Sequence, residues 1–270
     1  MPTITDFIPI YTAVAVAAVL AVTAVVFRLL TYPGAIVAAA TVVLAAVFWG
    51  YAGLLIYIAP FILNAVFGFV GKKKRRQAEE KFHAHTGKRG VRQVICNGAP
   101  ALIMMGIAFF TRLEVFYVAA AAAVAEGFAD SEAGDFGMAF GGKTVNILTF
   151  KECERGLSGG VSVVGTVAAL VAAAVTALLP MPFSGYGWAT FGAVVAGGFL
   201  GVMLDSALGA SVQALYRCPE CGTLTEKAYC HAETQLIRGY KRLDNNAVNI
   251  ISSFSGAVIA GGIAALILYL

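Results

Sequence analysis

Eight long apolar stretches constrain the fold of this chain more than any other feature. They cover residues 7–30, 34–50, 51–70, 94–111, 113–129, 161–179, 188–210 and 247–270. Because a helix needs about 20 mostly apolar residues to cross a bilayer, the stretches predict an all-α, polytopic transmembrane bundle. We expect about eight spans, with six to eight as the range because some stretches are short. The second and third stretches form one apolar run, which we divide at residues 49–53, where aromatic residues and glycines cluster.

The composition argues against an ordinary soluble domain. The chain has 270 residues, of which 59% are hydrophobic and 13% charged, whereas soluble domains carry about a quarter charged residues. A lipid-facing surface accounts for the excess of apolar side chains. The first stretch has no basic start and no small-residue cleavage site, so we expect a retained span rather than a signal peptide.

The positive charges predict the topology. With eight spans, segments 71–93, 130–160 and 211–246 lie on one side of the membrane, and together with Arg28 they hold 18 of the 19 lysines and arginines. Only Arg112 is left for the other side. We expect residues 1–270 to form one transmembrane domain in the cell membrane. Cytoplasmic loops carry the excess of Lys and Arg, and this excess predicts the orientation. We expect three cytoplasmic loops: a basic loop at 71–93, an acidic and glycine-rich loop at 130–160, and a cysteine-containing loop at 211–246. Both termini should be external.

Acidic residues at the inner end of the fifth stretch are the strongest sign of chemistry. Glu126 and Asp130 are four residues apart and share a face if the helix continues that far, and Asp135 follows. Carboxylates packed at a membrane edge repel one another and need cations. Mg²⁺ takes such oxygen ligands together with substrate phosphates, so Asp130 and Asp135 are candidate magnesium ligands. A solvated loop with a helix cap is the alternative.

Two further polar features lie at the inner ends of apolar stretches. Asp205 is surrounded by apolar residues, and an ionisable residue within a span is costly enough to suggest a function. A structural hydrogen bond to a neighbouring helix is the alternative. The last stretch opens with Asp244, Asn245, Asn246 and Asn249, of which a helix N-cap explains one residue but not four.

Basic and glycine-rich pieces have two interpretations each. The run at 72–76 is typical of an anchor for anionic lipids. Arg92 and Asn97 lie at a helix start, and helix N-termini favour phosphate, so both are candidates for phosphate contact. The pieces 141–143 and 156–160 could cradle phosphate through backbone N–H groups. Neither has P-loop spacing, and plain turns are the favoured interpretation.

The third segment contains a candidate zinc site. Cys218, Cys221, Cys230 and His231 combine a CPxCG knuckle with a later Cys-His pair, a four-ligand set suited to Zn²⁺. A cytoplasmic loop disfavours a disulfide, and unliganded thiols are the alternative. A closed set of four ligands would make the zinc structural rather than catalytic.

Five motifs resemble those of a known family. They are RQVICNG at 92–98, AEGFADSEAGDFG at 125–137, LSGGVS at 157–162, LDSALGASVQ at 204–213 and LDNNAVN at 243–249. Their order and spacing resemble an uncharacterised membrane-protein family that includes plant and cyanobacterial phytyl-phosphate kinases. The resemblance runs from about residue 90 to the C-terminus, and the first three stretches match only in being apolar. Against the family's acidic motif, Asp130 and Asp135 keep the acids, Ser131 replaces a threonine, and Gly134 removes a hydroxyl.

The resemblance implies Mg²⁺-dependent phosphoryl transfer from a nucleoside triphosphate, CTP by preference, to an isoprenyl monophosphate such as phytyl phosphate. On this hypothesis Asp130, Asp135 and Asp205 hold Mg²⁺ and carry the catalysis. The residues expected to bind substrate or nucleotide are Arg92, Asn97, Glu126, Ser131, Lys143, Lys151, Ser206, Asp244, Asn245, Asn246 and Asn249. The expected partners are the nucleotide, the lipid phosphate and membrane lipids, with no nucleic acid. An anionic acceptor needs positioning and charge neutralisation rather than a general base.

Two other classes of function remain open. A transporter or lipid scramblase would place polar residues through the depth of the bilayer around a midplane site, whereas here they collect at one face. A non-catalytic assembly protein that docks through the zinc knuckle would leave Asp205 and the acidic pair unexplained.

Overall fold

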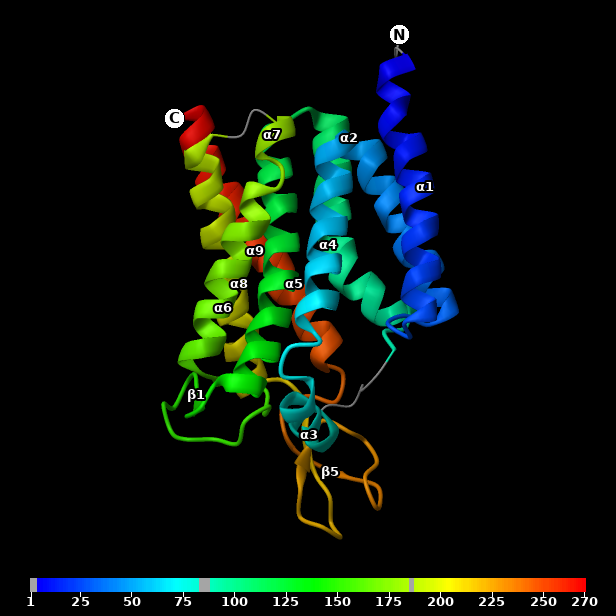
Figure 1. Cartoon of the computed structure of the whole chain (residues 1–270). Helices are drawn as coiled ribbons and strands as arrows, with labels where there is room; N and C mark the ends of the chain where they lie inside the picture. Colours follow the sequence, from blue (N-terminus) through cyan, green and yellow to red (C-terminus); the bar gives the residue numbers. More distant parts are fainter. Residues whose placement is uncertain (1–3, 83–87, 185–186) are drawn as a thin grey trace.

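The structure is a bundle of long helices with the strands and α3 at one end (Figure 1). The computed structural model describes residues 4–82, 88–184 and 187–270. In chain order the helices are α1 (Ile4–Val26), α2 (Tyr32–Phe67), α3 (Lys72–Phe82), α4 (Val91–Thr111), α5 (Glu114–Phe140), α6 (Val163–Leu178), α7 (Met181–Ser184), α8 (Trp188–Ser211) and α9 (Asn245–Tyr269). Both chain ends lie at the end opposite to α3 (Figure 1). The predicted helical membrane bundle is confirmed.

Helix α2 consists of two arms that fold back on each other. Gly50 leaves the helical region with φ 59° and ψ −140°, a conformation that glycine adopts without a steric penalty. Val42 of the first arm then packs in one cluster with Leu54 and Ile58 of the second arm. In a straight helix, residues 42 and 58 would be about 24 Å apart. The turn falls where the sequence predicts a division of the apolar run.

Length and composition identify fewer membrane spans than the predicted six to eight. Among the described residues, α2, α4, α8 and α9 are long and apolar enough to cross a membrane. Two shorter apolar helices are α6 and the part of α1 from Ile10 to Val26. Helix α5 is not in this set, because its second half carries acidic side chains. The higher expectation counted the two arms of α2 separately and included the shorter helices and α5.

The predicted acidic loop at 130–160 begins earlier in the sequence than the loop in the structure, which follows Phe140. Helix α5 continues to Phe140, so Asp130 and Asp135 lie on a helix rather than in a loop. The helix ends only at the glycine pair, where Gly142 takes a φ of 63°. Similarly, the predicted basic loop at 71–93 contains α3 and the first turn of α4, while residues 83–87 lie outside the described part.

Short strands give the loop regions regular structure. Strand β1 (Val145–Asn146) pairs antiparallel with β2 (Gly160–Val161) between α5 and α6. Between α8 and α9, an antiparallel sheet has the order β4-β3-β5, with β3 at Leu215–Arg217, β4 at Leu224–Thr225 and β5 at Gln235–Arg238.

Helix α5 forms the centre of the bundle and packs against α4, α6, α8 and α9. Its alanines at 120–122 are fully buried. Small residues also line the contact between α8 and α9, where a Cβ on Gly197 would lie 2.5 Å from the carbonyl oxygen of Gly256. Small side chains let helix backbones approach closely in a membrane, where no hydrophobic effect drives helices together.

Gly197→Ala should lower the stability of the purified protein, because the added methyl group would also lie 2.7 Å from Cβ of Ala260. We expect a loss of about 1–3 kcal/mol in the free energy of unfolding, as for other overpacked sites. Gly192→Ala on the same helix is the matched control, since a Cβ there has no neighbour within 4 Å. Thermal melting in detergent compares the two, and equal melting temperatures would contradict the close contact of α8 with α9.

Candidate functional site

A polar cavity of about 150 Å³ lies between α5, α6, α8 and α9 at the loop end of the bundle. We call it the acidic cavity. Four of the predicted site residues line it: Asp130 of α5, Asp205 and Ser206 of α8, and Asn245 of α9. The charges of Asp130 and Asp205 are close enough to act on each other. Residues that are far apart in the sequence therefore meet at one place.

Hydroxyl groups of α9 hold two buried carboxylates beside this cavity. Ser252 donates a hydrogen bond to Oδ2 of Asp205 at 3.1 Å, and Ser253 donates to Oε2 of Glu126. Glu126 is 1% exposed, and its Oε1 has no hydrogen-bond partner among the described residues. A Cβ on Gly201 would lie 2.6 Å from Cγ of Glu126, so this glycine makes room for the side chain.

The glycine-rich loop at 156–160 forms one wall of the acidic cavity. Gly159 has a φ of 85°, and a Cβ there would lie 2.5 Å from the backbone nitrogen of Ala210. The loop is thus a turn, as the sequence favours, and it packs directly against α8. Arg155 also lines the cavity, and its guanidinium donates to the carbonyl oxygens of Met138 at 3.3 Å and Gly142 at 3.0 Å.

Several predicted site residues lie outside the acidic cavity and have other partners. Asp135 forms an ion pair with Arg75 of α3. Arg92 pairs with Asp244, with 2.7 Å between Nη1 and Oδ2, and so joins the start of α4 to the start of α9. Asp244 also caps α9, since its Oδ1 accepts from the backbone N–H of Ala247 at 3.1 Å.

The remaining predicted residues divide between the surface and the interior. Lys143 pairs with exposed Glu152 at 2.7 Å, and Lys151 is exposed. Asn246 is buried in the first turn of α9. Asn249 donates from Nδ2 to Oδ1 of Asn97 at 3.4 Å, which links α9 to α4.

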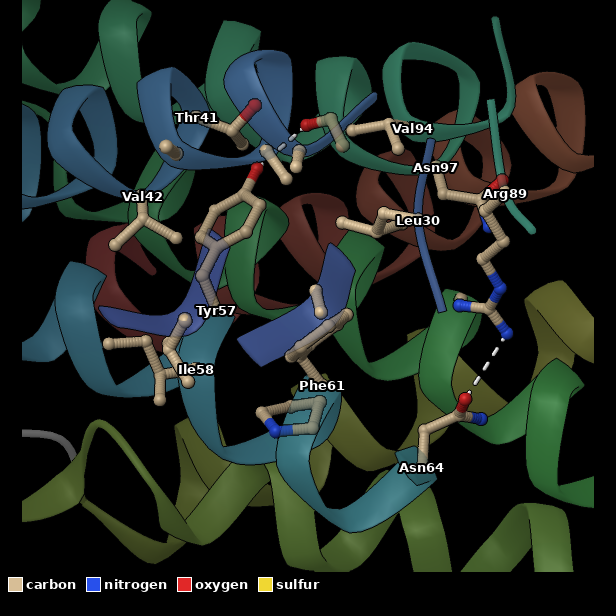
Figure 2. A pocket seen from close by; sticks show the side chains of 18 of the residues that line it. Leu30, Thr41, Val42, Tyr57, Ile58, Phe61, Asn64, Arg89, Val94 and Asn97 are labelled. Carbon is tan, nitrogen blue, oxygen red and sulfur yellow. Dashed lines mark hydrogen bonds between the residues drawn. The ribbon is translucent and has the colours of Figure 1, made fainter. Parts of the chain in front are cut away.

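A second cavity, of about 170 Å³, lies between α1, the two arms of α2, α4 and α5 (Figure 2). We call it the apolar cavity. Six alanines of α1 and α2 make up much of its lining, together with Tyr57 and Phe61. Asn64, Arg89 and Asn97 lie on one side of the cavity, which we call its polar end (Figure 2), and Gln93 and Ser131 also line the cavity. Figure 2 shows Nη2 of Arg89 directed at Oδ1 of Asn64, at 3.2 Å.

Sequence reasoning missed this cavity and several residues of both sites. Ser252 and Ser253 follow Asn249 by three and four positions, so they share its helix face. This spacing was a signal that could have identified them as site residues. Asn64, a polar residue near the end of an apolar stretch, was another. No signal marks Arg155 beyond its charge, whereas Arg89 belongs to the basic stretch that leads into the predicted helix start with Arg92 and Asn97.

Four side chains of the cysteine segment converge as the sequence suggests. The ligand atoms of Cys218, Cys221, Cys230 and His231 all lie within 4.8 Å of one another. A hydrogen bond with the backbone of Cys221 is the main cause that lowers the pKa of Cys218 to about 5. Hydrogen bonding with Thr223 lowers the pKa of Cys221. Cys218 is therefore poised to be a thiolate, the form that binds metal, whereas desolvation raises the pKa of Cys230.

The sheet that carries this cluster is attached to the glycine-rich loop. Ser158 of that loop donates a hydrogen bond to Glu226, which follows β4. Gln213, just before β3, donates from Nε2 to the hydroxyl of Ser158 at 3.1 Å. The backbone N–H of Glu226 also donates to the carbonyl oxygen of Phe82 in α3 at 2.8 Å. The sheet thus braces one wall of the acidic cavity.

Comparison with known proteins finds distant relatives. An uncharacterized membrane protein of Synechocystis sp. is 29% identical over 237 residues, which cover 83% of this chain and 79% of the relative. Protein VTE6, chloroplastic, of Arabidopsis thaliana is 27% identical over 219 residues, or 78% of this chain and 58% of that protein. Protein PGR of Arabidopsis thaliana is 26% identical over 218 residues, 71% of this chain and 74% of the relative. No solved structure matches the chain.

A family match covers most of the chain. The family described as Integral membrane protein DUF92 matches residues 15–257. The match includes the second half of α1 and all of α2, so the family likeness extends further towards the N-terminus than the motifs indicate. The membrane-protein family that the motifs resemble is thereby confirmed, and this chain belongs to the family Integral membrane protein DUF92.

Proposed function

We propose that this protein transfers a phosphoryl group from a Mg²⁺-bound nucleoside triphosphate to a lipid monophosphate at the loop end of the bundle. The observation that carries the proposal is the acidic cavity, where Asp130 and Asp205 meet a glycine-rich loop and Arg155. Carboxylates next to backbone N–H groups and a guanidinium suit a metal-bound polyphosphate. The family resemblance supports an isoprenyl monophosphate as acceptor and CTP as donor.

The donor groups of the acidic cavity fit magnesium. Asp130, Asp205, Ser206 and Asn245 offer oxygen atoms, the ligand type that Mg²⁺ prefers, and none of these side chains is a thiol or imidazole. Asp130 and Asp205 would hold the ion. When bound, Mg²⁺ would neutralise charge on the phosphates of the nucleotide.

The transfer needs little from the protein besides placement and charge. An oxygen of the lipid phosphate bonds to the γ-phosphorus while the bond from that phosphorus to the β–γ bridging oxygen breaks. The products are a lipid diphosphate and a nucleoside diphosphate. The acceptor oxygen is already anionic, so no proton has to be removed. Arg155 and the N–H groups of the loop at 156–160 would orient the phosphates as charge moves to the leaving oxygen.

We also propose that Cys218, Cys221, Cys230 and His231 bind a structural Zn²⁺. Three thiolates and one imidazole form a complete tetrahedral set, which leaves no position for a substrate. The sheet around the cluster is small and has little core of its own, and a metal compensates for that deficit. Through Glu226, the metal-bound sheet would fix Ser158 in the wall of the acidic cavity.

The loop end is proposed to face the cytoplasm, with both termini external. The positively charged loops gather at the end that carries α3, and the two chain ends lie opposite (Figure 1). Cytoplasmic nucleotides could then reach the acidic cavity. Of all lysines and arginines, Arg112 alone lies in the turn between α4 and α5 at the other end.

Asp130→Asn and Asp205→Asn should each lower the turnover number by about 100-fold or more, because each removes charge that the transition state requires. The measurement offers labelled CTP or ATP to the purified protein with phytyl and farnesyl monophosphates, with and without Mg²⁺. Glu114→Gln is the control, since Glu114 lies at the opposite end of α5. Absence of transfer to every lipid, together with solute movement in liposomes, would favour a transporter instead.

The purified protein should contain about one equivalent of zinc, and Cys221→Ser should lose most of it together with thermal stability. Elemental analysis by mass spectrometry gives the zinc content, and Co²⁺ substitution should give the absorption bands of a tetrahedral thiolate site. Cys153→Ser is the control, because Cys153 is not among the four clustered residues. A zinc-free protein that melts at the same temperature would contradict the proposal.

Reporter fusions at the C-terminus test the orientation. Alkaline phosphatase fused after Leu270 should be active, because this enzyme folds only outside the cytoplasm. Green fluorescent protein fused at the same position should not fluoresce, because it folds only in the cytoplasm. The opposite pattern would reverse the topology and place the acidic cavity outside.

A further inference from the structure

We propose that the apolar cavity is the binding site of the lipid acceptor, and that Arg89 binds its phosphate group. The inference deepens the proposed function, on which its account of the acceptor rests. The structure thereby assigns the two substrates to two cavities, the nucleotide to the acidic cavity and the lipid to the apolar one.

The walls of the apolar cavity suit a single hydrocarbon chain. Ala17, Ala21 and Ala24 of α1 and Ala35 and Ala38 of α2 line it. Small side chains at such positions leave a space that larger ones would fill. The aromatic ring of Phe61 and the aliphatic side chain of Ile58 line the same space (Figure 2). A ligand pocket with apolar walls and a few placed polar groups is the usual form of a small-molecule site.

Arg89 places a cation at the polar end of this cavity. Its backbone is fixed by two hydrogen bonds, from its N–H to the carbonyl oxygen of Leu29 at 2.9 Å and from the N–H of Thr31 to its carbonyl oxygen at 3.1 Å. Among the described residues, the side-chain hydrogen bond of its guanidinium goes to the neutral amide of Asn64. No described carboxylate lies within ion-pair distance, and the charges of Asp135, Asp130 and Glu132 act on Arg89 only from further away. An anionic ligand would supply a direct partner.

Other groups at the polar end also favour an anion. Helix α4 begins directly after Arg89, and its N-cap residue Gly90 makes no side-chain hydrogen bond to the first turn. Free N–H groups and the helix dipole at such an end attract phosphate. Asn97 lies near Arg89 (Figure 2), and its amide and that of Gln93 line the same space. The amide nitrogen of Asn64 already donates to Oε1 of Glu132 at 3.3 Å. Arginine forms paired hydrogen bonds with phosphate, whereas a neutral alcohol cannot use its charge.

Helix α5 separates the two cavities and brings their polar ends together. Gly127 and Ser131 line the apolar cavity, whereas Asp130 and Gly134 line the acidic one. The charges of Arg89 and Asp130 are close enough to act on each other. A lipid phosphate at Arg89 would therefore lie across α5 from the groups proposed to hold the nucleotide.

A binding experiment without nucleotide tests the site. The full-length protein in detergent is titrated with farnesyl monophosphate, with farnesol and with inorganic phosphate, and bound ligand is measured by native mass spectrometry. We expect tight binding of farnesyl monophosphate alone, and about a tenfold or larger loss of affinity in Arg89→Gln, because the charged hydrogen bonds are removed. Lys88→Gln is the matched control, since this neighbouring residue is exposed and does not line the cavity.

Two further variants protect the test against misfolding. Arg89→Lys keeps the positive charge and should retain part of the affinity, and a melting curve identifies any variant that does not fold. Ala39→Phe places bulk in the apolar part of the cavity. It should weaken binding of geranylgeranyl monophosphate more than binding of geranyl monophosphate, because the longer chain needs more of the space.

The outcomes separate this inference from the proposed function. Equal binding of farnesol and its monophosphate, or unchanged affinity in folded Arg89→Gln, would overturn the assignment of Arg89. Loss of lipid binding in Asp205→Asn but not in Arg89→Gln would place the lipid in the acidic cavity. If lipid binding depends on Arg89 but no nucleotide supports transfer, the lipid site is supported and the proposed kinase activity is rejected. Transfer with an unchanged KM for lipid in Arg89→Gln would support the kinase and reject Arg89 as the phosphate-binding residue.

Discussion

Carboxylates buried in an apolar bundle are the constraint around which this structure is built. Glu126 and Asp205 carry acids into a region where an unpaired charge costs several kcal/mol. Ser252 and Ser253 supply the hydrogen bonds, which requires α9 to pack against both α5 and α8 at one height. That contact in turn requires small residues, and Gly201 provides the space. Thus a polar site and a tightly packed small-residue core depend on each other.

The sequence predicts the fold class and which of several polar residues come together, because both depend on local patterns. Apolar length predicts the helices, and the polar clusters at the inner ends of spans predict that Asp130, Asp205 and Asn245 approach one another. Asp135 does not join them, and the reason is geometric. Since α5 stays helical, five positions from Asp130 correspond to a rotation of about 140° around the axis, which turns Asp135 towards Arg75.

Other parts of the site depend on packing that no local pattern encodes. The apolar cavity exists because α2 folds back at Gly50 and because many of the α1 and α2 residues that line it are alanines. Hydrophobic periodicity reports which residues are buried but not whether a space remains between them. In the same way, the attachment of the sheet to Ser158 follows from the fold around the cysteine cluster rather than from the cysteine spacing itself.

Helix α1 contacts the bundle mainly through α2 and forms an outer wall of the apolar cavity. Its alanines at positions 17, 21 and 24 follow one another at intervals of about one helical turn, or roughly 5.4 Å along the axis. One turn is comparable in length to one isoprene unit. If the apolar cavity binds the lipid tail as proposed, successive positions on α1 would lie beside successive isoprene units, and a single bulky side chain at one of them would limit the length of the tail.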